Sequence, residues 1–169
     1  MAKMYVLCGF SGVGKTTFAK DFAEQNGVIH LNIDDFYAQV NGDECDRSNM
    51  YVVWRLFFDT IRRYEQNDED IIIDVNCLTK GQREQFLEWF PSFSHHLIYI
   101  QADEDLRYKN NASRYRQVPE DAMQAQVDRF ECPSMKEIKM WDSYMRLRNI
   151  NNQAYHLQWA YPENNYVLL

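Results

Sequence analysis

Residues 9–17 read GFSGVGKTT and lie between two different sequence patterns. Residues 5–8 before them are apolar and predict a short buried strand. Residues 16–25 after them place apolar side chains at helical spacing, which predicts an amphipathic helix. The stretch matches the phosphate-binding pattern G-x-x-x-x-G-K-[ST] without a gap, in the strand–loop–helix context that this loop requires. The sequence therefore predicts a P-loop that binds a nucleoside triphosphate.

Each part of this loop has a chemical reason. Gly12 and Gly14 allow the backbone to approach phosphate oxygens and to turn its N–H groups toward them. The following helix directs its positive N-terminus at the anion. Lys15 is expected to reach the β- and γ-phosphates, and the Thr16 hydroxyl to bind Mg²⁺. The residues expected to contact the nucleotide, ATP, are Gly9, Ser11, Gly12, Val13, Gly14, Lys15, Thr16 and Thr17.

Strand and helix patterns alternate along most of the chain. Residues 38–48 are polar and are interpreted as a loop, and residues 143–150 fit either a helix or a fifth strand. Residues 155–159 and 166–169 are expected to be short strands. The other predicted strands are 28–33, 71–75 and 97–101, and the other predicted helices are 49–64, 79–90, 103–111 and 119–131.

This alternation predicts an α/β protein with a three-layer P-loop NTPase fold. We expect a parallel sheet of about five strands, with helices on both faces and a small helical lid. The 169 residues suit one domain, with the lid at about 105–131 and a C-terminal extension at about 140–169.

Polar residues stand where the second and third strands end. Asp34 and Asp35 follow the second strand, and Asp74 ends the third. In open α/β sheets ligands bind at the carboxyl ends of the strands, so these side chains are expected to face the phosphates. A kinase needs a base for the attacking hydroxyl, for which Asp34 is the candidate; Asp35 is expected to help orient the site or magnesium. Asp74 is the second candidate metal ligand, and Asn76 is expected to touch the acceptor.

Residues 109–116 read KNNASRYR and lie between two predicted helices. A flexible basic segment at this place can close over ATP as a lid, and the planar guanidinium group suits phosphate oxygens. Arg114 and Arg116 are the candidates to stabilise transition-state charge. The alternative is a solvated basic helix end, which the helix dipole also favours.

The composition excludes several classes of protein. A formal net charge of −7 and a pI of about 5.1 argue against a broad basic surface that binds nucleic acid. The four cysteines show no zinc-binding spacing. No apolar stretch approaches the roughly 20 residues of a membrane span, and no signal peptide is recognisable. We therefore expect a cytoplasmic protein with reduced thiols and no membrane partner.

Five motifs together resemble the kinase domain of phage and bacterial 5′-polynucleotide kinases. They are GFSGVGKTT, NIDDFY, IIIDVN, the arginine segment followed by VPED, and RFECP. The chain also resembles the wider group that holds zeta-toxin and small-molecule P-loop kinases. The resemblance covers about residues 3–135. It implies ATP and Mg²⁺ at Lys15 and Thr16, Asp34 as the general base, and Arg114 as a lid residue on the phosphates.

The chain departs from the polynucleotide kinases after the acidic pair. Those kinases usually carry an arginine there that grips the phosphate beside the acceptor, whereas this chain has Phe36-Tyr37-Ala38. Arg47 and Arg55 are the candidates to replace it, and Tyr37 is a candidate to stack on a base or sugar. The residues expected to contact the acceptor are therefore Asp35, Tyr37, Asn76 and Arg55.

Three functions stay open at this point. The first is an ATP-dependent kinase for a hydroxyl, most simply the 5′-OH of a polynucleotide or nucleoside. The second is a kinase for a sugar, antibiotic or nucleotide-sugar. The third is a nucleotide-binding regulatory module without phosphoryl transfer.

Overall fold

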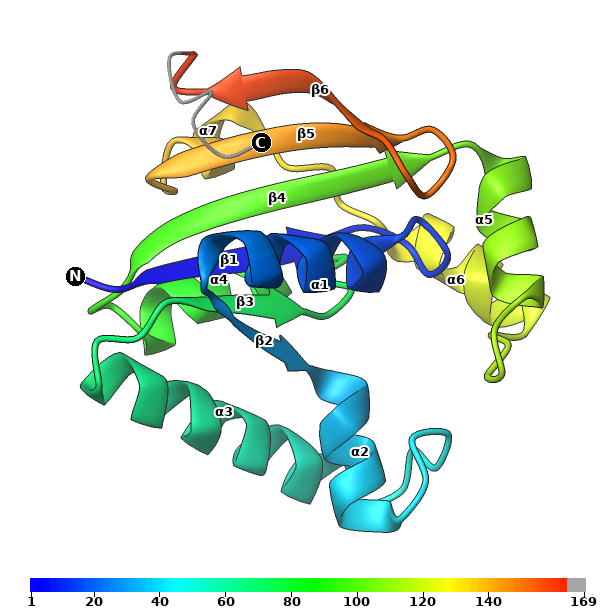
Figure 1. The fold of residues 1–169 in the computed structure, drawn as a ribbon, viewed down its shortest axis with the longest axis horizontal. Helices are drawn as coiled ribbons and strands as arrows, with labels where there is room; N and C mark the ends of the chain where they lie inside the picture. Colours follow the sequence, from blue (N-terminus) through cyan, green and yellow to red (C-terminus); the bar gives the residue numbers. More distant parts are fainter. Residues whose placement is uncertain (164–169) are drawn as a thin grey trace.

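The computed structural model describes residues 1–163 and has helices on both faces of one central sheet (Figure 1). The strands are β1 (Lys3–Cys8), β2 (Ile29–Asn32), β3 (Ile71–Asp74), β4 (Ser94–Ala102), β5 (Ser143–Asn149) and β6 (Tyr155–Tyr161). The helices are α1 (Lys15–Asn26), α2 (Ile33–Asn41), α3 (Met50–Gln66), α4 (Lys80–Trp89), α5 (Glu104–Ala112), α6 (Glu120–Arg129) and α7 (Met135–Ile138).

The sheet has the strand order β2-β3-β1-β4-β5-β6. The first five of these strands pair in parallel, and β6 adds an antiparallel edge to β5. The expected α/β fold with about five parallel strands is therefore confirmed, and a sixth, antiparallel strand extends it. The segment 143–150, which fitted a helix or a strand, is a strand over Ser143–Asn149 (β5). The strand expected at 155–159 is confirmed as β6, whereas residues 166–169 lie outside the described residues.

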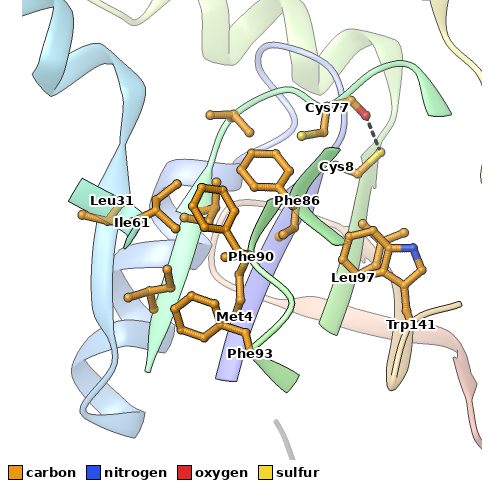
Figure 2. Packing of buried hydrophobic residues seen from close by; sticks show 14 of the residues in the cluster. Met4, Cys8, Leu31, Ile61, Cys77, Phe86, Phe90, Phe93, Leu97 and Trp141 are labelled. Atoms are coloured by element: carbon orange, nitrogen blue, oxygen red, sulfur yellow. Dashed lines mark hydrogen bonds between the residues drawn. The ribbon is translucent and has the colours of Figure 1, made fainter. Parts of the chain in front are cut away.

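Two apolar clusters lie between the sheet and its helices, one on each face of the sheet. The cluster on one face joins alternate residues of β1 to Phe57 and Ile61 of α3. It also includes Phe86 of α4 and Phe90, which follows the last residue of that helix (Figure 2). The cluster on the other face joins Tyr5 and Leu7 of β1 to the buried side of α1. Because strand side chains alternate between faces, β1 contributes to both clusters and is buried throughout its length after Lys3.

The prediction of a loop over residues 38–48 is wrong at its beginning, because α2 runs from Ile33 to Asn41. Asn32 caps this helix by accepting a hydrogen bond from the Asp34 backbone N–H, with its side-chain oxygen 2.9 Å from that nitrogen. The chain thus passes from β2 into a helix without a loop. Asp34 and Asp35 lie in the first turn of α2, where carboxylates also suit the helix dipole.

The expected helix after Thr79 is confirmed with its capping box, in which Thr79 and Gln82 exchange side-chain and backbone bonds. The parallel strands all direct their carboxyl ends to the same edge of the sheet, beside α5 and α6 (Figure 1). None of the helices in residues 1–163 is long and apolar enough to cross a bilayer.

Candidate active site

The glycine loop joins β1 to α1 in a conformation that needs glycine. Gly12 has φ 84°, and a Cβ added there would lie 2.5 Å from the Arg107 carbonyl oxygen of α5. Gly14 has φ 94° and caps the N-terminus of α1. Both positions are strained for any L side chain, so the glycines of the motif are required by backbone geometry and by the close approach of α5.

Three side chains hold the carbonyl groups of this loop. Asn110 Nδ2 donates to Gly12 O over 2.7 Å, Asn149 Nδ2 donates to Val13 O over 2.9 Å, and the Tyr155 hydroxyl donates to Gly14 O over 2.8 Å. A planar trans peptide points its N–H opposite to its carbonyl oxygen. The N–H groups that follow these carbonyls therefore point away from the three donors, as a phosphate-binding nest requires.

Lys15 is buried at the first position of α1. Its Nζ donates to the carbonyl oxygens of Gly9 and Phe10 over 3.0 and 2.8 Å. Burial lowers the pKa of Lys15 to about 8, and the Asp74 carboxylate opposes this shift. The ammonium group is thus poorly solvated, which strengthens its attraction to any anion that enters the loop.

A cavity of about 1310 Å³ opens in front of the loop. Five cationic side chains line it against two carboxylates, although the whole chain carries a net charge of −7. The predicted site residues that line it are Ser11, Gly12, Gly14, Lys15, Thr16, Thr17, Asp34, Tyr37, Asp74, Asn76, Arg114 and Arg116.

Four predicted residues do not line this cavity. Gly9 and Val13 belong to the loop, but Val13 is fully buried behind it. Asp35 is exposed on α2. Arg55 is directed away from the cavity and pairs with Asp59 one helical turn along α3, with 71% of its side chain exposed. The structure thus does not bring Arg55 to the expected acceptor side.

Asp34 meets two arginines at one carboxylate oxygen. Arg47 Nη2 lies 2.6 Å from Asp34 Oδ1, and Arg116 Nη1 lies 3.1 Å from the same atom. The Arg47 guanidinium also stacks over the Tyr37 ring, 4.1 Å from its centroid. Arg47 comes from the segment after α2 and lies beside Asp34. Its role of gripping a phosphate beside the acceptor stays a prediction.

Asp74 lies at the end of β3 and is 4% exposed. Its Oδ2 atom lies 3.2 Å from His30 Nε2 on the neighbouring strand β2. Within residues 1–163 no group of three or more His, Cys, Asp and Glu side chains is arranged to hold a metal ion. A hydroxyl from Thr16 and one carboxylate from Asp74 suit Mg²⁺, which keeps several waters and takes further oxygens from phosphates.

Sequence reasoning missed the amide side chains that fix the loop. Gln126 of α6 accepts from the Ser11 N–H over 2.8 Å and donates to the Ser11 hydroxyl over 2.9 Å. Asn110 and Asn149 hold the loop from α5 and β5, as described above. These contacts join residues 98 to 136 positions apart and follow no spacing rule, so no sequence signal marks them.

A model of the AAA_33 family, described as an AAA domain, matches residues 4–133. The chain belongs to the AAA_33 family. The AAA_33 match includes β1, the glycine loop, Asp34, Asp74 and the arginine segment, and it ends before α7 and β5. No curated protein matches the sequence.

Several solved structures have the same fold as this AAA_33 chain. A sugar kinase from Janibacter sp. HTCC2649 is 19% identical, with a TM-score of 0.66 over 88% of this chain and 86% of that one. A gluconokinase from Sinorhizobium meliloti 1021 is 17% identical, with a TM-score of 0.60 over 86% and 82%. A chain of the Pnkp1/Rnl/Hen1 RNA repair complex is 19% identical, with a TM-score of 0.68 over 76% of this chain and 43% of that one. At these identities the likeness shows a P-loop kinase fold and leaves the acceptor open.

Proposed function

We propose that the protein is an ATP-dependent phosphotransferase that moves the γ-phosphate of ATP to a hydroxyl group. The observation that carries this proposal is that the phosphate loop with Lys15 and the carboxylate of Asp34 line one cavity. The volume of about 1310 Å³ exceeds the roughly 300–1,000 Å³ of a pocket for one drug-sized ligand, so it has room for a nucleotide and an acceptor.

In the proposed reaction the acceptor hydroxyl attacks the γ-phosphorus in line with the leaving β-phosphate oxygen. Asp34 accepts the hydroxyl proton, and the bond from the γ-phosphorus to the bridging oxygen breaks. Lys15 stabilises charge on the β- and γ-phosphates. Arg114 and Arg116 line the same cavity from the segment between α5 and α6, and we propose that this segment is the lid.

Asp34 can act as a base only if its reactive oxygen is accessible to the acceptor. Arg47 and Arg116 both contact Oδ1. A phosphate group competes for guanidinium groups because it accepts the same bidentate bonds as a carboxylate. We therefore propose that Arg116 moves from Asp34 to a phosphate oxygen when ATP binds.

Mg²⁺ bound by Thr16 and Asp74 would supply charge neutralisation between the β- and γ-phosphates. The remaining metal ligands would be water and phosphate oxygens, in keeping with the reluctance of Mg²⁺ to lose its water.

For the acceptor we propose the 5′-OH of a polynucleotide or nucleoside. Part of the cavity wall is aromatic, with Trp54, Phe58 and Phe86 contributed by α3 and α4. Such a wall suits a planar base. Arg47, beside Tyr37 and Asp34, suits a phosphate group next to the acceptor hydroxyl.

A small-molecule acceptor such as a sugar is the second candidate. The fold likeness to a sugar kinase over 88% of this chain supports it, and aromatic side chains also stack on sugar rings. Salt separates the two candidates. The affinity for a polynucleotide should fall steeply as salt rises, whereas a neutral sugar should bind almost equally well at all salt concentrations.

The test is transfer of labelled γ-phosphate from ATP to DNA and RNA 5′-OH ends, nucleosides, gluconate and neutral sugars. The proposal predicts transfer with Mg²⁺ to at least one nucleic-acid or nucleoside acceptor. Transfer to sugars alone would support the second candidate. ATP binding without transfer to any of these acceptors would refute the proposed activity.

A further inference from the structure

The loop that follows β5 lies on the side of the glycine loop opposite to Asp34. In the sheet β1 leads into the glycine loop. Strand β2, which leads into α2 and Asp34, stands two strands away on one side, and β5 stands two strands away on the other. A triphosphate whose γ-phosphate faces Asp34 therefore extends its nucleoside toward the carboxyl end of β5. Asn152 of that loop lines the cavity there, together with Asn110 of α5.

Three asparagines form one hydrogen-bonded unit at this place. Asn149 is 1% exposed, and its Nδ2 donates to Asn152 Oδ1 over 2.9 Å, while its Oδ1 accepts from the Asn152 backbone N–H over 2.7 Å. Asn110 Nδ2 also donates to Asn152 Oδ1 over 2.9 Å, and Asn152 Nδ2 donates back to Asn110 Oδ1 over 2.7 Å. Asn152 has φ 67°, a left-handed conformation that asparagine tolerates. These four hydrogen bonds fix the orientation of the three side-chain amides relative to one another.

The bonds within residues 1–163 leave one side-chain donor and two side-chain acceptor positions of this unit unused. One of the acceptors, Asn149 Oδ1, belongs to a buried residue that does not line the cavity, so one donor and one acceptor remain for a ligand. Both hydrogens of Asn110 Nδ2 are used, because this nitrogen donates to Gly12 O and to Asn152 Oδ1. Asn152 Oδ1 accepts two bonds, which fills its capacity. Asn152 keeps its second Nδ2 hydrogen, and Asn110 Oδ1 keeps its second lone pair. Both residues line the cavity, so this neighbouring donor and acceptor can face a bound molecule.

We propose that Asn152 and Asn110 read the nucleobase and select adenine. Adenine presents a donor, its 6-amino group, next to an acceptor ring nitrogen, and asparagine pairs with that edge. The 6-amino group would donate to Asn110 Oδ1, and the ring nitrogen would accept from Asn152 Nδ2. With the base held in the same orientation by its triphosphate, a 6-keto group would set an oxygen against Asn110 Oδ1, where two acceptors repel each other.

This inference rests on the proposed function only in requiring a nucleoside triphosphate at the glycine loop. The two residues also differ in their relation to the family. Asn110 lies within the part of the chain that matches AAA_33, whereas Asn152 lies beyond residue 133. The proposed adenine-binding pair would thus combine Asn110, from the region shared with the family, and Asn152, from the loop between β5 and β6.

The test compares the dissociation constants of ATP and ITP, which differ only at the 6-position edge. Inorganic tripolyphosphate serves as a probe without a base. Wild-type protein should bind ATP at least ~tenfold more tightly than ITP. In Asn152→Ala this ratio should fall to less than ~threefold, and the affinity for tripolyphosphate should stay within ~twofold of wild type. Gln153→Ala is the matched control, because Gln153 is an exposed neighbour in the same loop.

Two results would overturn the inference alone. One is equal binding of ATP and ITP by the wild-type protein. The other is an Asn152→Ala variant that weakens ATP, ITP and tripolyphosphate by the same factor, because the asparagine would then only brace the glycine loop. A wild-type protein that binds neither a nucleotide nor tripolyphosphate would instead refute the proposed function, and this inference with it.

Discussion

Arg116 and Asp34 meet across the cavity, with Arg116 Nη1 3.1 Å from Asp34 Oδ1. The arginine belongs to the segment between α5 and α6, and the aspartate to the first turn of α2. The contact joins the two sides of the cavity that have to cooperate in phosphoryl transfer. It also gives Arg116 two exclusive partners in the proposed reaction, the base and a phosphate oxygen.

Arg116→Gln removes the guanidinium group that contacts Asp34 and that we propose to bind a phosphate oxygen. We expect kcat to fall by ~10²-fold or more, because a transition-state arginine contributes strongly to phosphoryl transfer. Steady-state kinetics with the best acceptor would measure this. Arg62→Gln is the control, since Arg62 is exposed on α3 and does not line the cavity. If Arg116→Gln turned over as fast as Arg62→Gln, Arg116 would have no role in the reaction.

Lys15→Met should change how stability depends on pH. Burial lowers the pKa of Lys15 to about 8 in the folded state, against 10.5 for a free lysine. Between these values the unfolded chain holds a proton that the folded protein has released, so the stability of wild type rises with pH. Relative to Lys15→Met, wild type should gain up to about 1.4 kcal/mol per pH unit in this range.

Urea unfolding of both proteins at several pH values from 7 to about 10.5 measures this difference. Comparing the two proteins cancels the contribution of the buried tyrosines, whose pKa shifts have causes other than Lys15. A stability difference that stays constant over this range would mean that Lys15 keeps an ordinary pKa in the folded protein.

Arg83 should be a strong determinant of stability. It is fully buried, its Nε lies 2.6 Å from Glu137 Oε1, and its Nη1 donates to the carbonyl oxygens of Cys77 and Leu78. Arg83→Met leaves the Glu137 carboxylate buried and unpaired, so we expect a loss of about 3–5 kcal/mol.

The double variant Arg83→Met, Glu137→Gln is the matched test, because it removes both charges of the pair. It should be more stable than Arg83→Met alone, as measured by urea unfolding. If the single and double variants were equally stable, the effect of Arg83 would come from its hydrogen bonds to the carbonyl oxygens of Cys77 and Leu78, and not from the ion pair with Glu137.

Gly12→Ala and Gly81→Ala should have opposite effects. A Cβ at Gly12 would meet the Arg107 carbonyl oxygen at 2.5 Å, and φ there is 84°, so we expect weaker nucleotide binding and a loss of about 1–3 kcal/mol of stability. A Cβ at Gly81 of α4 meets nothing within 4 Å, and alanine there should add about 0.5–1 kcal/mol. Thermal unfolding and nucleotide titration measure both effects. Two variants with the stability and nucleotide affinity of wild type would contradict this prediction.

The sequence predicted β1, the glycine loop and α1 closely because each has a local cause. The apolar run, the glycines with positive φ and the helical spacing all act within a few residues. The predicted helix that begins at Thr79 was also local, since both partners of its capping box lie within one turn.

The errors and omissions have long-range causes. Helix α2 was missed because Asn32 caps it directly at the end of β2, without the loop that usually separates a strand from a helix. Gln126 pairs with Ser11 and Asn149 with Val13 only after the sheet has assembled. The direction of the Arg55 side chain also depends on packing, because the way α3 packs on the sheet decides which of its side chains face the cavity. Arg55 faces away from the cavity and pairs with Asp59.

The most direct test of the account is the Asp34→Asn variant in a single-turnover assay with ATP, Mg²⁺ and the best acceptor of the panel. Asp105→Asn, an exposed carboxylate on α5, is the control. We expect Asp34→Asn to transfer phosphate ~10²–10⁴-fold more slowly while its affinity for ATP stays within ~threefold of wild type. Transfer at the wild-type rate would contradict the assignment of Asp34 as the base and, with it, the proposed mechanism.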